Sequence, residues 1–291
     1  MPCVRWNLDH YPSGSTLTYY ASSAGFRTRI VSDGRTLDLD DVGSVWCRGV
    51  QAAGFPDDMS PADRRFAQAE AERMLTALYT IADVRWINHP HGHACANSKP
   101  AQLAVASKLG LDIPLTIITN DPDEIRRFIA SSAGDTVYKA LTQSLETEPG
   151  KSLFTSVVTD KAIENLDLIR VTAGIFQRLV PKAYELRVTV VGSRVFSARI
   201  DSQLRPATRV DWRHLPFEVD AVQDIPGSVE LKIHALMREF GLQYGAFDFI
   251  VTPDGRHVFL EVNPAGHYMW IESKLGLPIT EALADALTEC R

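Results

Sequence analysis

Residues 244–264 read YGAFDFIVTPDGRHVFLEVNP, two apolar runs on either side of a Pro-Asp-Gly turn. Both runs are rich in β-branched and aromatic residues, and a turn of this kind between them predicts a β-hairpin. If Asp254-Gly255 forms a two-residue loop, Asp248 lies directly opposite Glu261 on the neighbouring strand. A Pro-led turn with a glycine bulge would shift that pairing by one residue, so both registers are open.

Three polar residues interrupt the apolar runs: Asp248, Glu261 and Asn263. Glu261 and Asn263 are two residues apart, so they point to the same face of one strand. Facing carboxylates repel, and a hard divalent cation such as Mg²⁺ neutralises them with oxygen ligands alone. The alternative is that the acids are solvated on an exposed face, which apolar neighbours such as Phe247 and Phe249 make harder to arrange.

The composition is that of an ordinary globular protein. The chain has 291 residues, 45% of them hydrophobic, and a net charge of −6. This length suffices for one large or two to three small domains. A negative charge without a basic run argues against nucleic-acid binding. No long apolar run or signal-peptide pattern is present, so we expect a cytoplasmic protein without a membrane partner. The four cysteines lack a CxxC pair and indicate reduced thiols.

The first part of the chain, to about residue 88, mixes short strands with one helix. Strands are predicted at 28–31, 43–46 and 86–88. Asp33-Gly34 predicts a turn. Ser60-Pro61 predicts the start of a helix that runs to about Tyr79, with Ser60 as its N-cap and Pro61 at its first position.

A run of alternating metal-ligand residue types follows in NHPHGHACANSK, residues 88–99. Imidazole and thiolate are transition-metal ligands, so His89, His91, His93 and Cys95 raise the question of a metal site. Alternate residues converge only on an extended strand, whereas Pro90 and Gly92 favour a loop. We therefore expect a loop here, leading into a helix over 99–109 that Gly110 ends.

Two lysines stand at positions that suit an anion. Lys99 lies in the first helical turn, where a cation is unfavourable against the helix dipole unless an anion lies nearby. Lys139 lies in a predicted strand, 136–140, and either extends to solvent or faces a bound anion. The polar stretch 141–151 after it is typical of a mobile loop that closes over a ligand. Each lysine is also compatible with an ordinary solvated side chain.

The C-terminal half predicts further strands and two helices. Residues 175–180 (IFQRLV) are compatible with a buried strand. Residues 184–191 (YELRVTVV) alternate strongly, and Gly192-Ser193 predicts a turn into a strand over 195–200, so Glu185 and Arg187 share one face. Other elements are expected as strands over 111–118 and 154–158 and as helices over 123–131, 229–240 and 279–287.

The hairpin, the two lysines and the segments ELRVTVVG (185–192), RID (199–201) and DWR (211–213) together resemble the ATP-grasp ligases. Within them, the chain resembles the graspetide synthetases that macrocyclise ribosomal peptides, as in microviridin biosynthesis, and is also similar to ribosomal-protein glutamate ligases. The resemblance covers about 42–287. It implies an α/β (α+β) ATP-grasp fold in three parts, a reduced pre-ATP-grasp domain (1–95), a central subdomain (96–176) and a C-terminal subdomain (177–291). The family usually opens with a strand and a helix that would precede Pro2, so the start is expected to be reduced or truncated.

The resemblance also implies roles for single residues. It assigns the Mg²⁺ ions of ATP to Asp248, Glu261 and Asn263. It assigns ATP contacts to seven residues, with the lysines at the phosphates, the 177–180 linker at the adenine and the acid at the ribose: Lys99, Lys139, Gln177, Arg178, Leu179, Val180 and Glu185. Three arginines are candidates for steadying the transferring phosphoryl group or an oxyanion, because a guanidinium fork matches those oxygens: Arg187, Arg199 and Arg213.

The activity implied is ADP-forming ligation. An Asp or Glu side chain of a ribosomal precursor peptide becomes an acylphosphate and then forms an ω-ester or ω-amide ring, while the leader of that peptide binds elsewhere, between Arg199 and Trp212. The resemblance further implies a homodimer. An alternative is an ATP-grasp ligase that adds a free amino acid to a protein or small acid. A catalytically dead binding module is a third reading, which the complete set of catalytic residue types disfavours.

Overall fold

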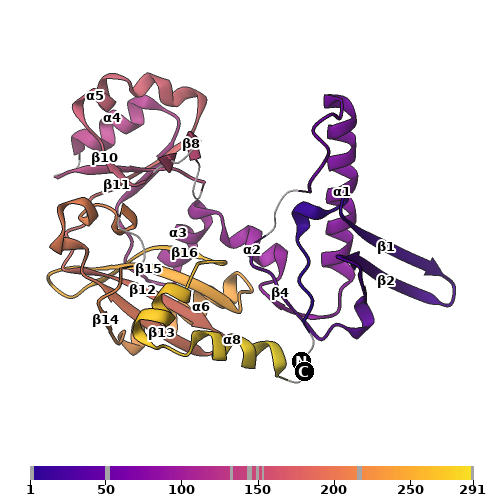
Figure 1. Ribbon diagram of the computed structural model, residues 1–291. Coiled ribbons are helices and arrows are strands. Elements are labelled where there is room, and N and C mark those ends of the chain that lie inside the picture. Colours follow the sequence, from indigo (N-terminus) through magenta and orange to yellow (C-terminus); the bar gives the residue numbers. More distant parts are fainter. Residues whose placement is uncertain are drawn as a thin grey trace. The chain divides into compact units, whose positions relative to one another are not determined.

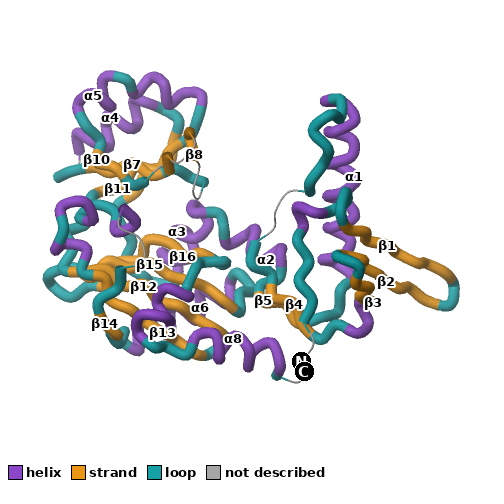
Figure 2. The backbone as a smooth tube through the Cα atoms, in the orientation of Figure 1, coloured by secondary structure: helices purple, strands orange, loops and turns teal. Residues whose placement is uncertain are grey.

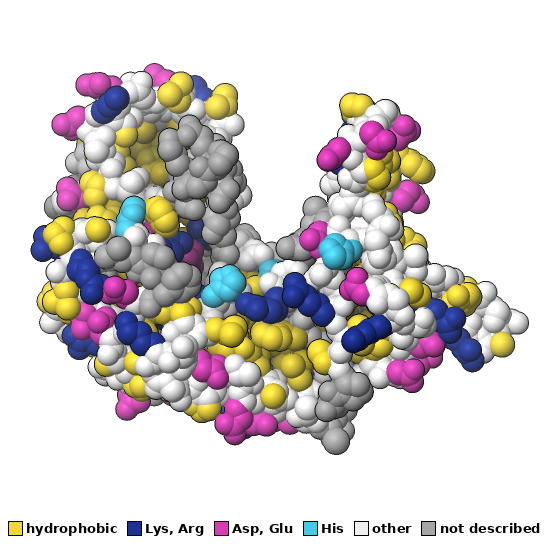
Figure 3. Space-filling model, in the orientation of Figure 1, with side chains coloured by type: hydrophobic (Ala, Val, Ile, Leu, Met, Phe, Trp, Pro, Cys, Tyr) yellow, Lys and Arg dark blue, Asp and Glu magenta, His cyan; other side chains and the backbone are white. Residues whose placement is uncertain are grey.

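The computed structural model describes residues 3–49, 53–131, 134–142, 146–148, 151–152, 154–214 and 218–289. The chain divides into two compact units, residues 1–93 with 284–291 and residues 94–283. Helices and strands occur in both, so the predicted mixed fold class is confirmed. Among the described residues, no helix is long and apolar enough to cross a membrane. On the face drawn in Figure 3, acidic and basic side chains are interspersed.

The first unit combines one long helix with two small sheets. An antiparallel sheet has the order β1 (Ser15–Ser22), β2 (Gly25–Ser32), β3 (Arg35–Asp38), and Figure 2 shows β1 and β2 as a long ribbon. A parallel pair consists of β4 (Ser44–Trp46) and β5 (Arg85–Ile87). Helix α1 (Pro61–Ile81) buries Leu75 and Leu78 in a core that includes Leu17 of β1 and Ile30 of β2.

Local sequence signals explain this unit well. The Ser60 hydroxyl accepts a hydrogen bond from the Asp63 amide, and Pro61 occupies the first helical position, so the predicted start of α1 is confirmed. Asp33 and Gly34 adopt positive φ angles of 50° and 70°, which makes the predicted tight turn between β2 and β3. The three predicted strands are also present, whereas β1 and β3, which are largely exposed, had no apolar alternation to reveal them.

The prediction of a loop at 88–99 is wrong, because Pro90 opens a short helix, α2 (Pro90–Ala96). Proline is tolerated at the first position of a helix, where its missing N–H is not needed. Among the described residues, no three His, Cys, Asp or Glu side chains lie together as a group that could hold a metal ion, so this segment does not form a metal site. His89 instead bonds the Tyr79 carbonyl through Nε2, and His93 is buried.

The second unit contains two larger antiparallel sheets. The five-stranded sheet has the order β14 (Ala221–Val222), β13 (Arg194–Ile200), β12 (Tyr184–Val191), β15 (Tyr244–Val251), β16 (His257–Asn263). The four-stranded sheet has the order β10 (Ser156–Val157), β7 (Thr136–Lys139), β11 (Gly174–Arg178), β6 (Thr116–Thr119). A separate pair consists of β8 (Glu146–Glu148) and β9 (Lys151–Ser152).

Helices cover one face of each of these sheets. Against the five-stranded sheet lie α3 (Lys99–Lys108) and α6 (Gly227–Glu239), packed on a core that includes Phe247, Phe249 and Phe259 (Figure 1). The four-stranded sheet packs with α4 (Pro122–Ser131) around Ile125 and Phe176, and α5 (Asp160–Glu164) follows β10. The chain ends with α7 (Met269–Leu275), which we did not predict, and α8 (Ile279–Thr288).

Most predicted elements of the second unit are confirmed within a few residues, with two differences. The strand expected at 111–118 pairs only over 116–119, because Pro114 lacks an N–H to donate. The residues before it make a single bridge, between Asp112 and Val258. Of the loop expected at 141–151, residues 143–145 and 149–150 lie outside the described residues, and the rest includes β8 and the first residue of β9.

Candidate active site

The face of the five-stranded sheet that is turned away from α3 and α6 carries the predicted polar residues. Alternate residues of β12, such as Leu186 and Val188, enter the core, which leaves Glu185 and Arg187 on the opposite face. Arg187 pairs with Asp248 of β15, and Asp248 pairs with Glu261 of β16. The three side chains therefore form one row across three adjacent strands.

The predicted pairing of Asp248 with Glu261 is confirmed, but by a different route from the one expected. Near the turn, Phe249 pairs with Phe259, one residue out of step with the pairing that a two-residue loop would give. A bulge at Leu260 then restores the pairing at Glu261. Because a bulge places two consecutive residues opposite one, Leu260 and Glu261 both leave the core face, while Phe259 and Val262 enter it.

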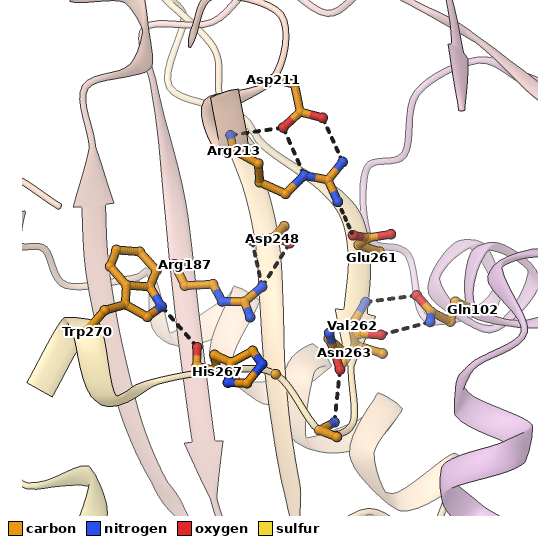
Figure 4. Close-up of polar contacts among 12 residues, drawn as sticks. Gln102, Arg187, Asp211, Arg213, Asp248, Glu261, Val262, Asn263, His267 and Trp270 are labelled. Carbon is orange, nitrogen blue, oxygen red and sulfur yellow. Dashed lines mark hydrogen bonds and ion pairs between the residues drawn. The ribbon is translucent and has the colours of Figure 1, made fainter. Parts of the chain in front are cut away.

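Arg187 and Asp248 form a buried ion pair at the centre of the row (Figure 4). Arg187 Nη1 donates to both carboxylate oxygens, over 3.0 Å and 2.9 Å. Arg187 Nε is buried and donates to no described group. Burial raises the pKa of Asp248, and the Arg187 charge opposes this rise.

Glu261 is surrounded by cations. Lys99 Nζ lies 3.4 Å from Glu261 Oε2, and Arg213 Nη1 lies 4.0 Å from Oε1. Burial alone would raise the pKa of Glu261, but Lys99 and Arg213 outweigh it and hold the pKa below its usual value. Two facing carboxylates thus remain close together because cations from other elements accompany each of them.

Asp211 holds Arg213 in place beside Glu261. Its carboxylate accepts bonds from Arg213 Nε at 2.9 Å and Nη2 at 2.6 Å, and its Oδ2 also accepts from the Thr155 amide at 3.0 Å. Burial opposes ionisation of Asp211, but the Arg213 bonds and charge keep its pKa well below the usual range. The contact with Thr155 connects this pair to the segment that enters β10.

A small pocket lies next to the row of charges, and Leu260 of the bulge forms part of its lining. The predicted linker residues Gln177, Arg178, Leu179 and Val180 line it. Its other lining residues are mostly apolar: Pro114, Val137, Lys139, Thr155, Lys182, Val210, Ile250 and Leu260. Burial lowers the pKa of Lys139, which Glu261 and Asp211 partly counter.

Glu185 is engaged by a residue that we did not predict. Lys182 Nζ donates to Glu185 Oε1 at 3.0 Å and to the Val210 carbonyl at 2.8 Å, and both charged side chains are about 95% buried. Burial raises the pKa of Glu185, and Lys182 opposes the rise. The pair lies at the pocket, since Lys182 lines it.

Arg199 lies apart from the other predicted arginines. It pairs with Leu186, and directly opposed residues of an antiparallel pair point to the same face, which here is the core face. Its guanidinium lies 4.2 Å from the centre of the Tyr184 ring and bonds Asp201 at 2.7 Å. The structure therefore does not bring Arg199 together with Arg187 and Arg213.

Asn263 and the following turn complete the site. Asn263 follows Glu261 on the same face of β16, and its Oδ1 accepts from the Ala265 amide at 2.9 Å. Gly266 packs so closely that a Cβ there would lie 2.5 Å from Arg187 Nη2 and from Ala246 Cβ. Asp248 and Glu261 offer carboxylate oxygens, which Mg²⁺ prefers, and the Asn263 side chain lies on the same face with its oxygen bonded to the Ala265 amide.

The chain is similar to several known proteins. Residues 1–93 match the family described as the MvdD pre-ATP grasp domain. None of the curated protein sequences matches the chain. A RiPP-associated ATP-grasp ligase from Chryseobacterium gregarium, solved with ADP and a leader and core peptide, is 30% identical with a TM-score of 0.88, over 98% of this chain and 87% of that chain.

Two macrocyclases from Microcystis aeruginosa are similar to this chain to about the same degree. MdnC, solved with the precursor peptide MdnA, is 32% identical with a TM-score of 0.84, over 98% of this chain and 90% of MdnC. MdnB is 31% identical with a TM-score of 0.84, over 99% of this chain and 90% of MdnB.

The fold is that of an ATP-grasp protein. More narrowly, the chain belongs to the family of RiPP-associated ATP-grasp ligases that includes these peptide macrocyclases. Membership confirms the predicted family, the ATP-grasp fold and the enzyme class, an ADP-forming ligase. It also agrees with the predicted function, ligation on a precursor peptide, which is the main reading of the sequence.

Proposed function

We propose that this protein uses ATP to activate an Asp or Glu side chain of a ribosomal precursor peptide. The carboxylate attacks the γ-phosphorus, the bond to the β-phosphate oxygen breaks, and ADP leaves with that electron pair. A Ser or Thr hydroxyl or a Lys amine of the same peptide then attacks the acylphosphate carbon. Phosphate departs, the nucleophile loses its proton, and an ω-ester or ω-amide closes a ring.

The row Arg187–Asp248–Glu261 and its cations are the observation that carries this proposal. Three acids, Asp211, Asp248 and Glu261, stand with four cations, Lys99, Lys139, Arg187 and Arg213, so the site has a net positive charge. A cationic site with its acids in a row suits a polyanion such as a triphosphate.

The adjoining pocket suits the nucleoside part of ATP. Its apolar walls, which include Val137, Ile250 and Leu260, match the faces of a purine ring, and the 177–180 linker forms one side. Glu185 is the group for the ribose hydroxyls, with Lys182 beside it. Lys139 both lines the pocket and interacts electrostatically with Glu261, so it suits a phosphate between the two regions.

Asp248, Glu261 and Asn263 are the residues that would hold Mg²⁺. A divalent cation bound there would neutralise phosphate charge and orient the phosphoryl oxygens. The residues fit, because their side chains share one face of the sheet and the carboxylates of Asp248 and Glu261 are direct cross-strand neighbours there.

Arg187 and Arg213 are the proposed catalytic residues. Arg187 lies in the row and Arg213 lies beside it, next to Glu261. The buried Arg187 Nε lacks a described acceptor, which an oxygen of the transferring phosphoryl group or of a tetrahedral oxyanion would supply. Arg213 is oriented by Asp211 toward the same carboxylate, Glu261. Arg199 is not included, because it lies on the other face of the sheet.

The substrate class rests on the relatives. The C. gregarium ligase was solved with a leader and core peptide and MdnC with its precursor, which supports a precursor peptide as partner here. Leader binding between Arg199 and Trp212, a homodimer and a cytoplasmic location stay predictions.

The test is mass spectrometry of a candidate precursor, a short peptide rich in Thr, Ser, Asp and Glu encoded beside the gene. It is incubated with enzyme, ATP and Mg²⁺, in parallel with Asp248→Asn and Glu261→Gln variants. The expected result is loss of one water mass per ring, dependent on ATP and absent with both variants. ADP release triggered only by a free amino acid would replace this function with the amino-acid ligase. No ADP with either substrate would overturn the ligase assignment for this chain.

A further inference from the structure

The Gln102 side chain makes an unusual contact with the backbone of β16. It comes from α3 and is only 1% exposed. Its Oε1 accepts from the Val262 amide at 2.8 Å, and its Nε2 donates to the Val262 carbonyl at 2.8 Å. Nε2, whose bond to Val262 is drawn in Figure 4, also donates to the Ala96 carbonyl at 2.6 Å, so both amide donors and the amide oxygen have partners.

This contact supplies the backbone hydrogen bonds that a neighbouring strand would otherwise make. β16 is the edge of the five-stranded sheet, so its outward N–H and C=O groups have no strand partner there. A buried backbone group without a partner is strongly unfavourable. Gln102 pairs both groups of Val262 at once, and upstream the Asp112 carbonyl accepts from the Phe259 amide at 2.8 Å. The bulge at Leu260 is thus flanked by these two outer contacts.

The Gln102 contact falls at a functionally important position of β16. Val262 lies between Glu261 and Asn263, two of the proposed metal ligands. Fixing its peptide groups fixes the backbone from which both side chains project. Lys99, one turn before Gln102 on α3, reaches Glu261 Oε2 at 3.4 Å. Helix α3 therefore contacts β16, which carries two proposed metal ligands, at two points, through the Lys99 cation and through the Gln102 amide.

We infer that Gln102 is a positioning residue for the cation site, holding Glu261 and Asn263 in the geometry that binds a divalent cation. The inference rests on the metal ligands named in the proposed function. Replacement of Gln102 by Met keeps the volume but removes both bonds to Val262. Because residues that orient metal ligands affect affinity by 10- to 100-fold, we expect a loss of about tenfold in metal affinity.

The experiment uses Mn²⁺ as an EPR-active probe on the full chain with saturating ADP, with wild type compared with Gln102→Met. Expected results are a roughly tenfold weaker Mn²⁺ dissociation constant and faster hydrogen exchange at the Val262 amide in metal-free protein. ADP affinity in EDTA should stay within about twofold of wild type, because Gln102 does not line the pocket. Gln102→Glu keeps the acceptor for the Val262 amide, so its Mn²⁺ affinity should fall between those of wild type and Gln102→Met.

Two further variants make the result decisive. Val190→Ala removes volume from the same core but lies on β12, which pairs with β15 and not with β16. It is therefore a control for any loss of stability in Gln102→Met, and it should leave Mn²⁺ affinity unchanged. Asp248→Asn tests the metal ligands themselves. If Asp248→Asn binds Mn²⁺ normally, the proposed metal site fails. If Asp248→Asn loses Mn²⁺ but Gln102→Met does not, or if Val190→Ala loses as much as Gln102→Met, only the positioning role fails.

Discussion

Arg187 places a single nitrogen, Nη1, within hydrogen-bonding distance of both carboxylate oxygens of Asp248, and the two residues are direct cross-strand neighbours. Both side chains are buried. A proposed metal ligand is thus paired with a proposed catalytic residue. An ion pair of this kind is costly to break from one side only.

The first prediction concerns this pair. Arg187→Met leaves the Asp248 charge buried and unpaired, and should lower the free energy of unfolding by about 3–5 kcal/mol. The double variant with Asp248→Leu should recover most of that loss but no ligase activity. Urea unfolding of the single and double variants measures this. The exposed pair Arg126–Asp123 is the control, where Arg126→Met should change stability by less than about 1 kcal/mol. Equal instability of both Arg187 variants would contradict the prediction.

The second prediction concerns the pH dependence at Asp211. Its pKa is lower in the folded than in the unfolded chain, so its carboxylate stabilises the fold above the unfolded pKa, and that contribution is lost as pH falls through the folded pKa. Asp211→Asn should lower the free energy of unfolding by about 2 kcal/mol at pH 7. This difference should persist to about pH 5 and shrink below about pH 4. Urea unfolding at pH 7, 5 and 3 tests it, and a difference independent of pH would argue against an ionised Asp211.

The third prediction concerns Gly266. Its Cβ position lies 2.5 Å from Arg187 Nη2, so Gly266→Ala must displace the guanidinium from the row. We expect kcat to fall by about tenfold or more, since small misplacements of catalytic groups have large effects, with ADP affinity unchanged. Gly227→Ala is the matched control, because a Cβ there meets nothing within 4 Å, and it should be neutral. Full activity of Gly266→Ala would show that Arg187 tolerates displacement.

The fourth prediction concerns Lys182. Loss of its bond to Glu185 raises the pKa of that buried carboxylate further, and a protonated Glu185 accepts bonds from the ribose hydroxyls less well. Lys182→Met should therefore weaken ADP binding by about tenfold at pH 6, with a smaller loss at pH 8. Titration calorimetry at the two pH values measures this. Lys161→Met, at an exposed position of α5, should bind ADP as wild type does. If the two variants bind alike, Lys182 has no part in holding the nucleotide.

The sequence predicted the hairpin and its acids because three polar residues stand within apolar strands, a local pattern. The partners that complete the site are distant along the chain, such as Asp211 with Thr155 and Gln102 with Val262, and no local periodicity reports such pairs. Lys182 had a weak signal, since it lies three residues before Glu185 in the linker.

The separation of Arg199 from Arg187 follows from the sequence itself. The Gly192-Ser193 turn fixes the pairing of β12 with β13, and this pairing places residue 199 opposite Leu186 rather than Arg187. Strand alternation then assigns Arg199 to the core face. The bulge at Leu260, in contrast, could not be foreseen, because an apolar residue suits either face of a strand at that point.

The bulge has a consequence for how such a site can change. Without Leu260, Phe259 and Glu261 would be consecutive, and their partners Phe249 and Asp248 are consecutive too, so the two strands would form an uninterrupted ladder. The carboxylates would still face each other, but the pocket would lose Leu260 from its lining. A single inserted residue therefore adds a wall to the pocket without moving the facing carboxylates out of register, so the pocket lining and the row of charges can be varied separately.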